Sequence, residues 1–299
     1  MLSASSGYGR WAPYVWLNGE VVRAEQARVS VFDRGLLLGD GVYETLRVHR
    51  GRLFRWKDHR DRLVRSLSAA RIELTFSPDT LEGAVGACLA ANRLQEARLR
   101  LTITRGEGDP GFDMMPGASP NTMIAASPWQ PLPEERTRAG VSAILATLRQ
   151  TGRDSLDPAL KSISRIHLVL ARLEASQRGA VEAILLGSDG LVREGTASNV
   201  FLVRRGALRT PSVDCGILEG VTRAAVMEVA AAANIACEEG RILPGELASA
   251  DEIFFTNTSW GALPVALLDG NRVGAGSAGP MALELGRGLA ELVERECTP

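Results

Sequence analysis

The sequence has few cysteines, almost no net charge and no long apolar run, and each of these deficits excludes a class of protein. Its four cysteines, Cys88, Cys215, Cys237 and Cys297, are far apart and form no C-x-x-C pair, so neither a zinc site nor a disulfide framework is expected. The 34 Lys and Arg residues nearly balance the 35 Asp and Glu residues, so no basic surface is expected to bind nucleic acid or an anionic membrane. No apolar stretch is long enough to cross a bilayer, and no signal peptide is recognisable. We therefore expect a cytoplasmic protein.

What the sequence does contain is typical of a globular protein with two domains. Hydrophobic residues make up 45% of the 299 residues and charged residues 23%, which is sufficient for more than one core. Lys57–Leu74 has apolar residues at helical spacing, whereas Leu99, Leu101 and Ile103 alternate with polar residues as in a half-buried strand. Three prolines and several charges in the segment 128–138 indicate a domain boundary there.

Strands and helices alternate beyond this boundary. The pattern predicts a mixed fold, α+β or α/β, with a small N-terminal domain over 1–130, a linker over 131–138 and a large C-terminal domain over 139–299. The strands expected in the large domain are Val141–Thr147, Val181–Leu186, Asn199–Val203 and Glu252–Thr256, and the helices are Ser162–Arg178, Gly220–Ala233 and Ala278–Glu294.

Four segments of the large domain carry residue types suited to chemistry. Lys161 stands just before the helix expected at Ser162, and Glu194 ends one strand shortly before another begins. The glycine and threonine in Gly220–Thr222 open an Ala-rich helix, where free backbone amides and a hydroxyl can hold a phosphate. The segment 254–265 has a turn of small polar residues after a strand. Taken singly, each segment is explained equally well without a function, as a solvated lysine, a helix cap or an ordinary turn.

Taken together and in this order, the segments resemble the class IV aminotransferase family, the fold type IV enzymes that use pyridoxal 5′-phosphate. Further matches are LNGE at 17–20, GDGVYETLRV at 39–48, and the H-x-x-R-L pattern of His59, Arg62 and Leu63. The resemblance runs from about Trp16 to Leu292. It implies a small α/β domain, a larger α/β domain with a barrel-like sheet, and a homodimer.

The resemblance also assigns roles to individual residues. Lys161 matches the lysine that binds the cofactor aldehyde covalently and acts in catalysis, Glu194 the acid facing the pyridine nitrogen, and Arg62 the arginine that binds the phosphate. The remaining cofactor-binding residues that it implies are Arg165, Asn199, Val221, Thr222 and Thr258. Tyr43 matches an aromatic residue of the substrate pocket, Trp260 is a candidate wall of that pocket, and the candidates for binding the substrate carboxylate are Arg47, Arg100 and Arg105.

The activity implied is the transfer of an amino group between an amino acid and a 2-oxo acid such as 2-oxoglutarate or pyruvate. A branched-chain-type amino acid is the first choice and a D-amino acid the second, although the R-x-H carboxylate trap of the D-amino-acid enzymes is missing from GEGDPGFD at 106–113. Arg165, in the pattern K-x-x-x-R, is instead similar to aminodeoxychorismate lyases, which eliminate pyruvate and give p-aminobenzoate. A catalytically inactive cofactor-binding protein is a third alternative.

Overall fold

The computed structural model describes residues 10–108, 111–113 and 119–298. The chain divides into two compact units. The smaller unit contains residues 10–130, Leu160–Ser164 and 296–298, and the larger unit contains Pro131–Ala159 and Arg165–Arg295. The predicted domains 1–130 and 139–299 are uninterrupted ranges, whereas Leu160–Ser164, which carries Lys161, groups with the smaller unit.

The smaller unit is built on an antiparallel sheet whose strands follow the order β2-β1-β6-β5-β3-β4. Leu99, Leu101 and Ile103 are fully buried on one face of this sheet, as their alternation with polar residues predicts. The strands are β1 (Tyr14–Leu17), β2 (Glu20–Arg23), β3 (Gly41–His49), β4 (Arg52–Leu53), β5 (Ala97–Thr104) and β6 (Asn121–Pro128).

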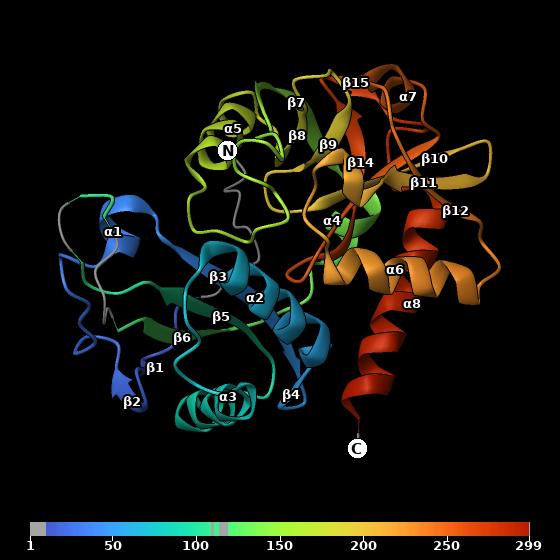
Figure 1. Cartoon of the computed structure of the whole chain (residues 1–299). Helices are drawn as coiled ribbons and strands as arrows, with labels where there is room; N and C mark the ends of the chain where they lie inside the picture. The colour runs from blue at the N-terminus through green and yellow to red at the C-terminus, as the bar shows by residue number, and fades with distance from the viewer. Residues whose placement is uncertain (1–9, 109–110, 114–118, 299) are drawn as a thin grey trace. The chain divides into compact units, whose positions relative to one another are not determined.

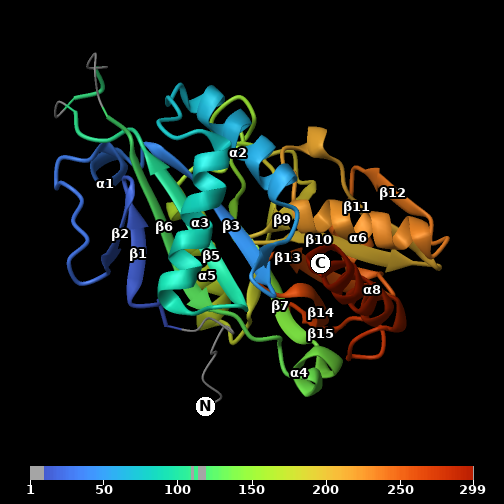
Figure 2. The ribbon, with the colours of Figure 1, turned by 90° about the horizontal axis from the view of Figure 1, so that it is seen from below.

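Two helices, α2 (Trp56–Ala70) and α3 (Pro78–Asn92), pack on that face and close the core of the smaller unit (Figures 1 and 2). The helix expected to reach Leu74 ends at Ala70, because Arg71 adopts a left-handed conformation (φ 52°) and its amide bonds back to the last turn. The short helix α1 (Arg34–Leu38), capped by Asp33, was not predicted.

The larger unit contains a curled sheet of mixed strand direction, in the order β12-β11-β10-β13-β14-β7-β8-β9, with β15 paired to β14 (Figure 1). The pairs β7–β8, β7–β14 and β11–β12 are parallel. The strands are β7 (Val141–Arg149), β8 (Glu182–Leu186), β9 (Val192–Gly195), β10 (Asn199–Arg204), β11 (Ala207–Pro211), β12 (Cys237–Gly240), β13 (Glu252–Asn257), β14 (Gly261–Leu268) and β15 (Asn271–Arg272).

The helices of the larger unit flank this sheet: α5 lies against β7 and β8, and α6 lies beside α8 (Figure 2). Their bounds are α4 (Glu134–Ala139), α5 (Ile166–Gln177), the 3₁₀ turn η1 (Val213–Cys215), α6 (Val221–Ala232), α7 (Pro244–Ala248) and α8 (Pro280–Cys297). The predicted start of α5 at Ser162 is wrong, because Ser162 and Ile163 pair with the start of β3 instead of continuing the helix. In the described part of the chain, no helix combines the length and apolarity needed to cross a membrane.

Candidate active site

The segment that carries Lys161 is fixed by its backbone. The Lys161 carbonyl accepts a hydrogen bond from the Tyr43 amide at 3.0 Å, and the Lys161 amide donates to Ser66 Oγ at 3.3 Å. Ser162 forms a β-bridge with Val42. Lys161 is therefore held at the edge of the smaller unit's sheet by bonds that do not involve its side chain.

The side chain of Lys161 lies near two other residues of the predicted site. Its Nζ is 4.9 Å from the centroid of the Tyr43 ring, and the guanidinium carbon of Arg100 is 3.8 Å from the same centroid. Tyr43 pairs with Thr102 across β3 and β5, two residues from Arg100, so both side chains point to one face of the sheet. The structure thus brings together Lys161, Tyr43 and Arg100.

The other two arginines predicted to bind the substrate carboxylate have protein partners. Arg47 is buried, stacks over Trp129 and donates to Glu96 Oε2 at 2.7 Å. Arg105 bonds both carboxylate oxygens of Asp40, at 2.7 and 3.0 Å. Arg100 lies against the same tyrosine ring as Lys161, and this position makes it our candidate for the substrate carboxylate.

Arg62, the predicted phosphate ligand, belongs to a buried charged cluster. Its Nε and Nη2 donate to the two oxygens of Glu44 at 2.8 and 2.7 Å, and His59 Nδ1 is 2.8 Å from the same carboxylate. Burial raises the pKa of Glu44, but the charge and hydrogen bonds of Arg62 and His59 outweigh it, so the pKa lies well below its ordinary value. Burial lowers the pKa of His59. The cluster fixes the orientation of the Arg62 guanidinium.

We expect Glu44→Gln to lower the free energy of unfolding by about 3 kcal/mol at pH 7, because it leaves the buried Arg62 charge without its partner. A depressed folded-state pKa gives stability that is present at neutral pH and lost as the pH falls below the ordinary glutamate range. The unfolding curves of the variant and the wild type, measured by chemical denaturation, should therefore differ most at neutral pH and converge progressively as the pH falls below the ordinary glutamate range.

The matched control is Asp61→Asn on the same helix, which breaks the exposed ion pair between Lys57 and Asp61 and should leave the unfolding midpoint unchanged. Equal losses of unfolding free energy in Glu44→Gln and Asp61→Asn would show that the buried cluster stabilises the fold no more than an exposed ion pair does.

In the larger unit, Glu194 is surrounded by hydrogen-bond donors. Gln150 Nε2 donates to Oε1 at 2.8 Å, while the Leu218 amide and Asn199 Nδ2 donate to Oε2 at 3.0 and 3.3 Å. His167 Nε2 lies 2.9 Å from Gln150 Oε1. Glu194 is buried, so these donors stabilise its ionised form, which has acceptors on both oxygens. Gln150 and His167 were not identified from the sequence, because neither stands in a recognisable motif.

The start of α6 is suited to an anion. Its N-cap is Gly220, so no side chain accepts from the amides of the first turn. A Cβ on Gly220 would come within 1.9 Å of Asn199 Oδ1, so a larger residue here would displace the Asn199 amide. Val221 and Thr222, which the sequence singles out as phosphate ligands, are the first two helical residues and are both buried. Backbone amides at such a helix start bind phosphate.

The second predicted phosphate turn, which includes Thr258, follows β13. Asn257 Oδ1 accepts hydrogen bonds from the Ser259 and Trp260 amides at 2.9 and 2.8 Å, which fixes the turn around Thr258. Trp260 is buried, with the Arg172 guanidinium 5.5 Å from its ring. Thr256 Oγ1 is buried and has no hydrogen-bond partner among the described residues. The turn therefore has a fixed backbone and carries the hydroxyl-bearing residues Thr258 and Ser259.

Two further features of the larger unit complete the description. Arg165 is the N-cap residue of α5, and burial together with the charge of Arg165 lowers the pKa of His167.

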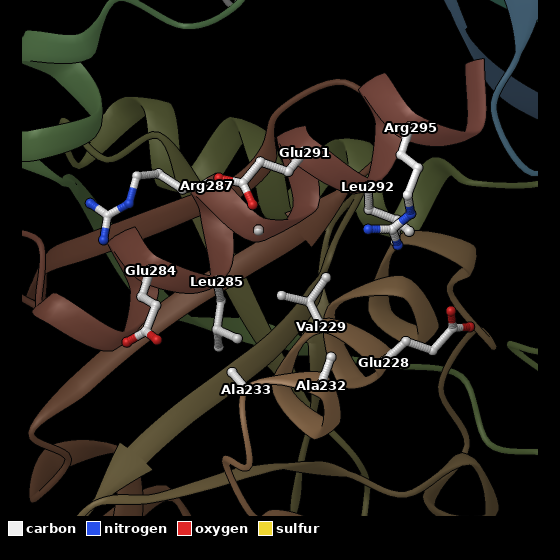
Figure 3. A pocket seen from close by; sticks show the side chains of 11 residues that line it. Glu228, Val229, Ala232, Ala233, Glu284, Leu285, Arg287, Glu291, Leu292 and Arg295 are labelled. Carbon is white, nitrogen blue, oxygen red and sulfur yellow. The ribbon is translucent and has the colours of Figure 1, made fainter. Parts of the chain in front are cut away.

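A pocket of about 470 Å³ lies between α6 and α8, lined by Glu228, Arg287 and Glu291 among others (Figure 3). None of the predicted site residues lines this pocket, so we assign it no part in the site.

Comparison with known proteins identifies close likenesses. The family model described as amino-transferase class IV matches residues 41–268. The chain is 38% identical to a putative branched-chain-amino-acid aminotransferase of Methanocaldococcus jannaschii, over 91% of this chain and 93% of that one. It is 34% identical to a D-alanine aminotransferase of Bacillus licheniformis, over 89% and 92% of the two chains.

Solved structures are similar over nearly their whole length. A T.th. branched-chain amino acid aminotransferase with pyridoxamine 5′-phosphate superposes with a TM-score of 0.91 at 31% identity, covering 96% of both chains. A second structure of that enzyme, complexed with N-(5′-phosphopyridoxyl)-L-glutamate, gives a TM-score of 0.90 at 30% identity and the same coverage.

Proposed function

The chain belongs to the class IV aminotransferase family, and from this premise we propose that it transfers amino groups between a branched-chain-type amino acid and a 2-oxo acid such as 2-oxoglutarate. The predicted family, fold and cofactor are confirmed: the protein is an aminotransferase that uses pyridoxal 5′-phosphate. The choice of amino acid rests on the likeness to branched-chain enzymes. The observation that carries the activity is the grouping of Lys161, Tyr43 and Arg100 in the smaller unit.

The residues present fit this cofactor. The α6 start with its glycine N-cap suits a phosphate, and Glu194 with its three N–H donors suits a protonated pyridine nitrogen. When bound, pyridoxal phosphate supplies an electron sink for negative charge at the substrate Cα. We assign the phosphate to Val221, Thr222, Thr258 and Arg62, the nitrogen to Glu194 with Asn199 beside it, and the remaining cofactor contact to Arg165.

Lys161 has two roles in this proposal. Its Nζ would hold the cofactor covalently, and once freed by an amino-acid substrate the same amine would take the proton from the substrate Cα as general base. The backbone hydrogen bonds of 160–164 fix the main chain at Lys161, and its Nζ lies 4.9 Å from the centroid of the Tyr43 ring. The ionised Glu194 would accept a hydrogen bond from the pyridine nitrogen and so keep that nitrogen protonated.

We assign the substrate carboxylate to Arg100 and expect Arg100→Met to raise KM for the amino acid about 30-fold, because a charge-assisted pair contributes on the order of 2 kcal/mol. Steady-state kinetics with L-leucine measures this change. Arg52→Met, which removes an exposed arginine of β4, is the control and should leave KM unchanged. An unaltered KM in Arg100→Met would show that another group binds the substrate carboxylate.

One assay tests the activity against its main alternative. The purified protein is mixed with L-leucine or D-alanine and 2-oxoglutarate, and glutamate is measured. We expect glutamate from L-leucine. Arg165 in its K-x-x-x-R pattern favours the second candidate, aminodeoxychorismate lyase. Release of pyruvate and p-aminobenzoate from aminodeoxychorismate, without glutamate in the first assay, would establish that alternative.

The proposal includes a cytoplasmic homodimer. It is supported by an apolar stripe on α5 at the helical spacing i, i+3, i+4 and i+7, which is 47–69% exposed in the single chain and is formed by Ile166, Val169, Leu170 and Leu173. A second copy of the chain would cover this stripe, and sedimentation equilibrium measures whether the protein is dimeric.

A further inference from the structure

A chain of hydrogen bonds leads from helix α5 to the carboxylate of Glu194. His167 Nε2 is 2.9 Å from Gln150 Oε1, and Gln150 Nε2 donates to Glu194 Oε1 at 2.8 Å. Gln150 and Glu194 are 5% and 4% exposed. Gln150 follows the last residue of β7, and His167 is the second residue of α5. Segments that are distant in sequence therefore meet at one buried carboxylate.

The direction of each hydrogen bond follows from the partners of Gln150. The Thr151 amide donates to Gln150 Oε1 at 3.0 Å, so that atom is the acceptor and the amide nitrogen must face Glu194. The reverse orientation would set the carbonyl oxygen against a carboxylate and the NH₂ group against an N–H donor. Because Oε1 only accepts, His167 must carry its proton on Nε2. Burial and Arg165 lower the pKa of His167, which is consistent with a neutral ring.

We infer that Gln150 is a positioning residue for the cofactor acid: held by His167 and Thr151, it fixes Glu194 in place and keeps it ionised. This inference rests on the proposed role of Glu194 at the pyridine nitrogen. A hydrogen bond to a buried ionised carboxylate is about twice as strong as one between neutral groups. If the Gln150 side chain lost its amide, Glu194 Oε1 would lose a hydrogen-bond donor in a buried environment. The neutral carboxylic acid form of Glu194 would then be favoured.

The consequence for the chemistry is specific. An ionised Glu194 accepts a hydrogen bond from the protonated pyridine nitrogen and so favours its protonated form. A neutral Glu194 carries no charge and does not favour that form. Gln150 would therefore act on the protonation of the cofactor nitrogen through Glu194. A residue that only supports the fold would change the stability of the protein and leave this protonation as it is.

The test is the ¹⁵N NMR signal of holoenzyme loaded with cofactor labelled at the pyridine nitrogen, followed over a pH titration. We expect Gln150→Leu, which keeps the size of the side chain and removes its donor, to lower the midpoint of nitrogen deprotonation by about one pH unit, a roughly tenfold change in the equilibrium. Gln177→Leu, at an exposed glutamine near the end of α5, is the matched control and should titrate like the wild type.

His167 variants keep the inference testable if Gln150→Leu fails to fold. His167→Phe should lower the midpoint by less than Gln150→Leu does, and His167→Gln, which retains an N–H donor, should restore it. A wild-type titration in folded Gln150→Leu would overturn the inference. Glu194→Gln distinguishes failure of this inference from failure of the proposed role of Glu194. If Glu194→Gln also titrates like the wild type, the role of Glu194 at the pyridine nitrogen fails. If Glu194→Gln shifts the midpoint and Gln150→Leu does not, only the role of Gln150 fails.

Discussion

Lys161→Ala is expected to abolish transamination, with kcat lowered on the order of 10³-fold or more, because the variant lacks both the covalent anchor of the cofactor and the amine that moves the proton. The fold should be unaffected. The hydrogen bonds that hold the segment involve the backbone of Lys161 and Ile163, and alanine keeps them. Glutamate formation under saturating substrate measures kcat, and circular dichroism measures the fold.

The sequence offers an unusually clean control for this variant. Lys57 is the only other lysine among the 299 residues, and it lies on the surface of α2 in an exposed ion pair with Asp61. Lys57→Ala should retain the wild-type kcat. Turnover at the wild-type rate in Lys161→Ala would contradict the assignment.

Glu194→Gln is expected to lower kcat on the order of 10²-fold, the loss typical of removing one preorganised electrostatic group. Glutamine has nearly the same shape, but it carries no charge and cannot hold the proton of the pyridine nitrogen. It also presents an NH₂ group to one side of a ring of N–H donors from Gln150, Asn199 and Leu218. The cofactor should remain bound, since Lys161 and the phosphate ligands are unchanged.

Two measurements together distinguish this effect from a loss of cofactor: kcat, and the absorbance of bound cofactor after gel filtration. The expected result is a variant that binds as much cofactor as the wild type but has a lower kcat. A fully loaded variant with the wild-type kcat would show that another group protonates the nitrogen, and the role of Glu194 would have to be withdrawn.

Local patterns in the sequence predicted much of the fold. The alternation of Leu99, Leu101 and Ile103 placed β5 correctly, and Pro78 marked the start of α3. Glu194 and Asn199 were correctly placed at the end of one strand and the start of the next. These features depend on neighbouring residues, whose periodicity the sequence displays directly.

The wrongly predicted start of α5 involves contacts between distant residues. The apolar spacing after Lys161 extended the predicted helix back to Ser162, but backbone bonds to Val42 and Gly41 hold Ser162 and Ile163 in an extended segment. No local pattern indicates such a competing partner. Helix formation at this point is decided by tertiary structure and not by the spacing of apolar residues.

The same limit applies to the candidate site. Arg47, Arg100 and Arg105 were equivalent from the sequence. The fold separates them, because it places Arg100 against the same Tyr43 ring as Lys161. Gln150 stands 44 residues before Glu194 in an unremarkable segment. Its importance arises because the fold places its side-chain amide against Oε1 of a buried carboxylate. The roles of these residues in catalysis stay predictions until the variants are measured.

The central claim is the covalent bond between Lys161 and the cofactor, and borohydride reduction of the holoenzyme followed by peptide mass mapping tests it most directly. The account predicts a phosphopyridoxyl group on the peptide that contains Lys161 and none on the peptide that contains Lys57, the only alternative lysine. A modified Lys57, or no modified lysine in protein that binds the cofactor, would contradict it.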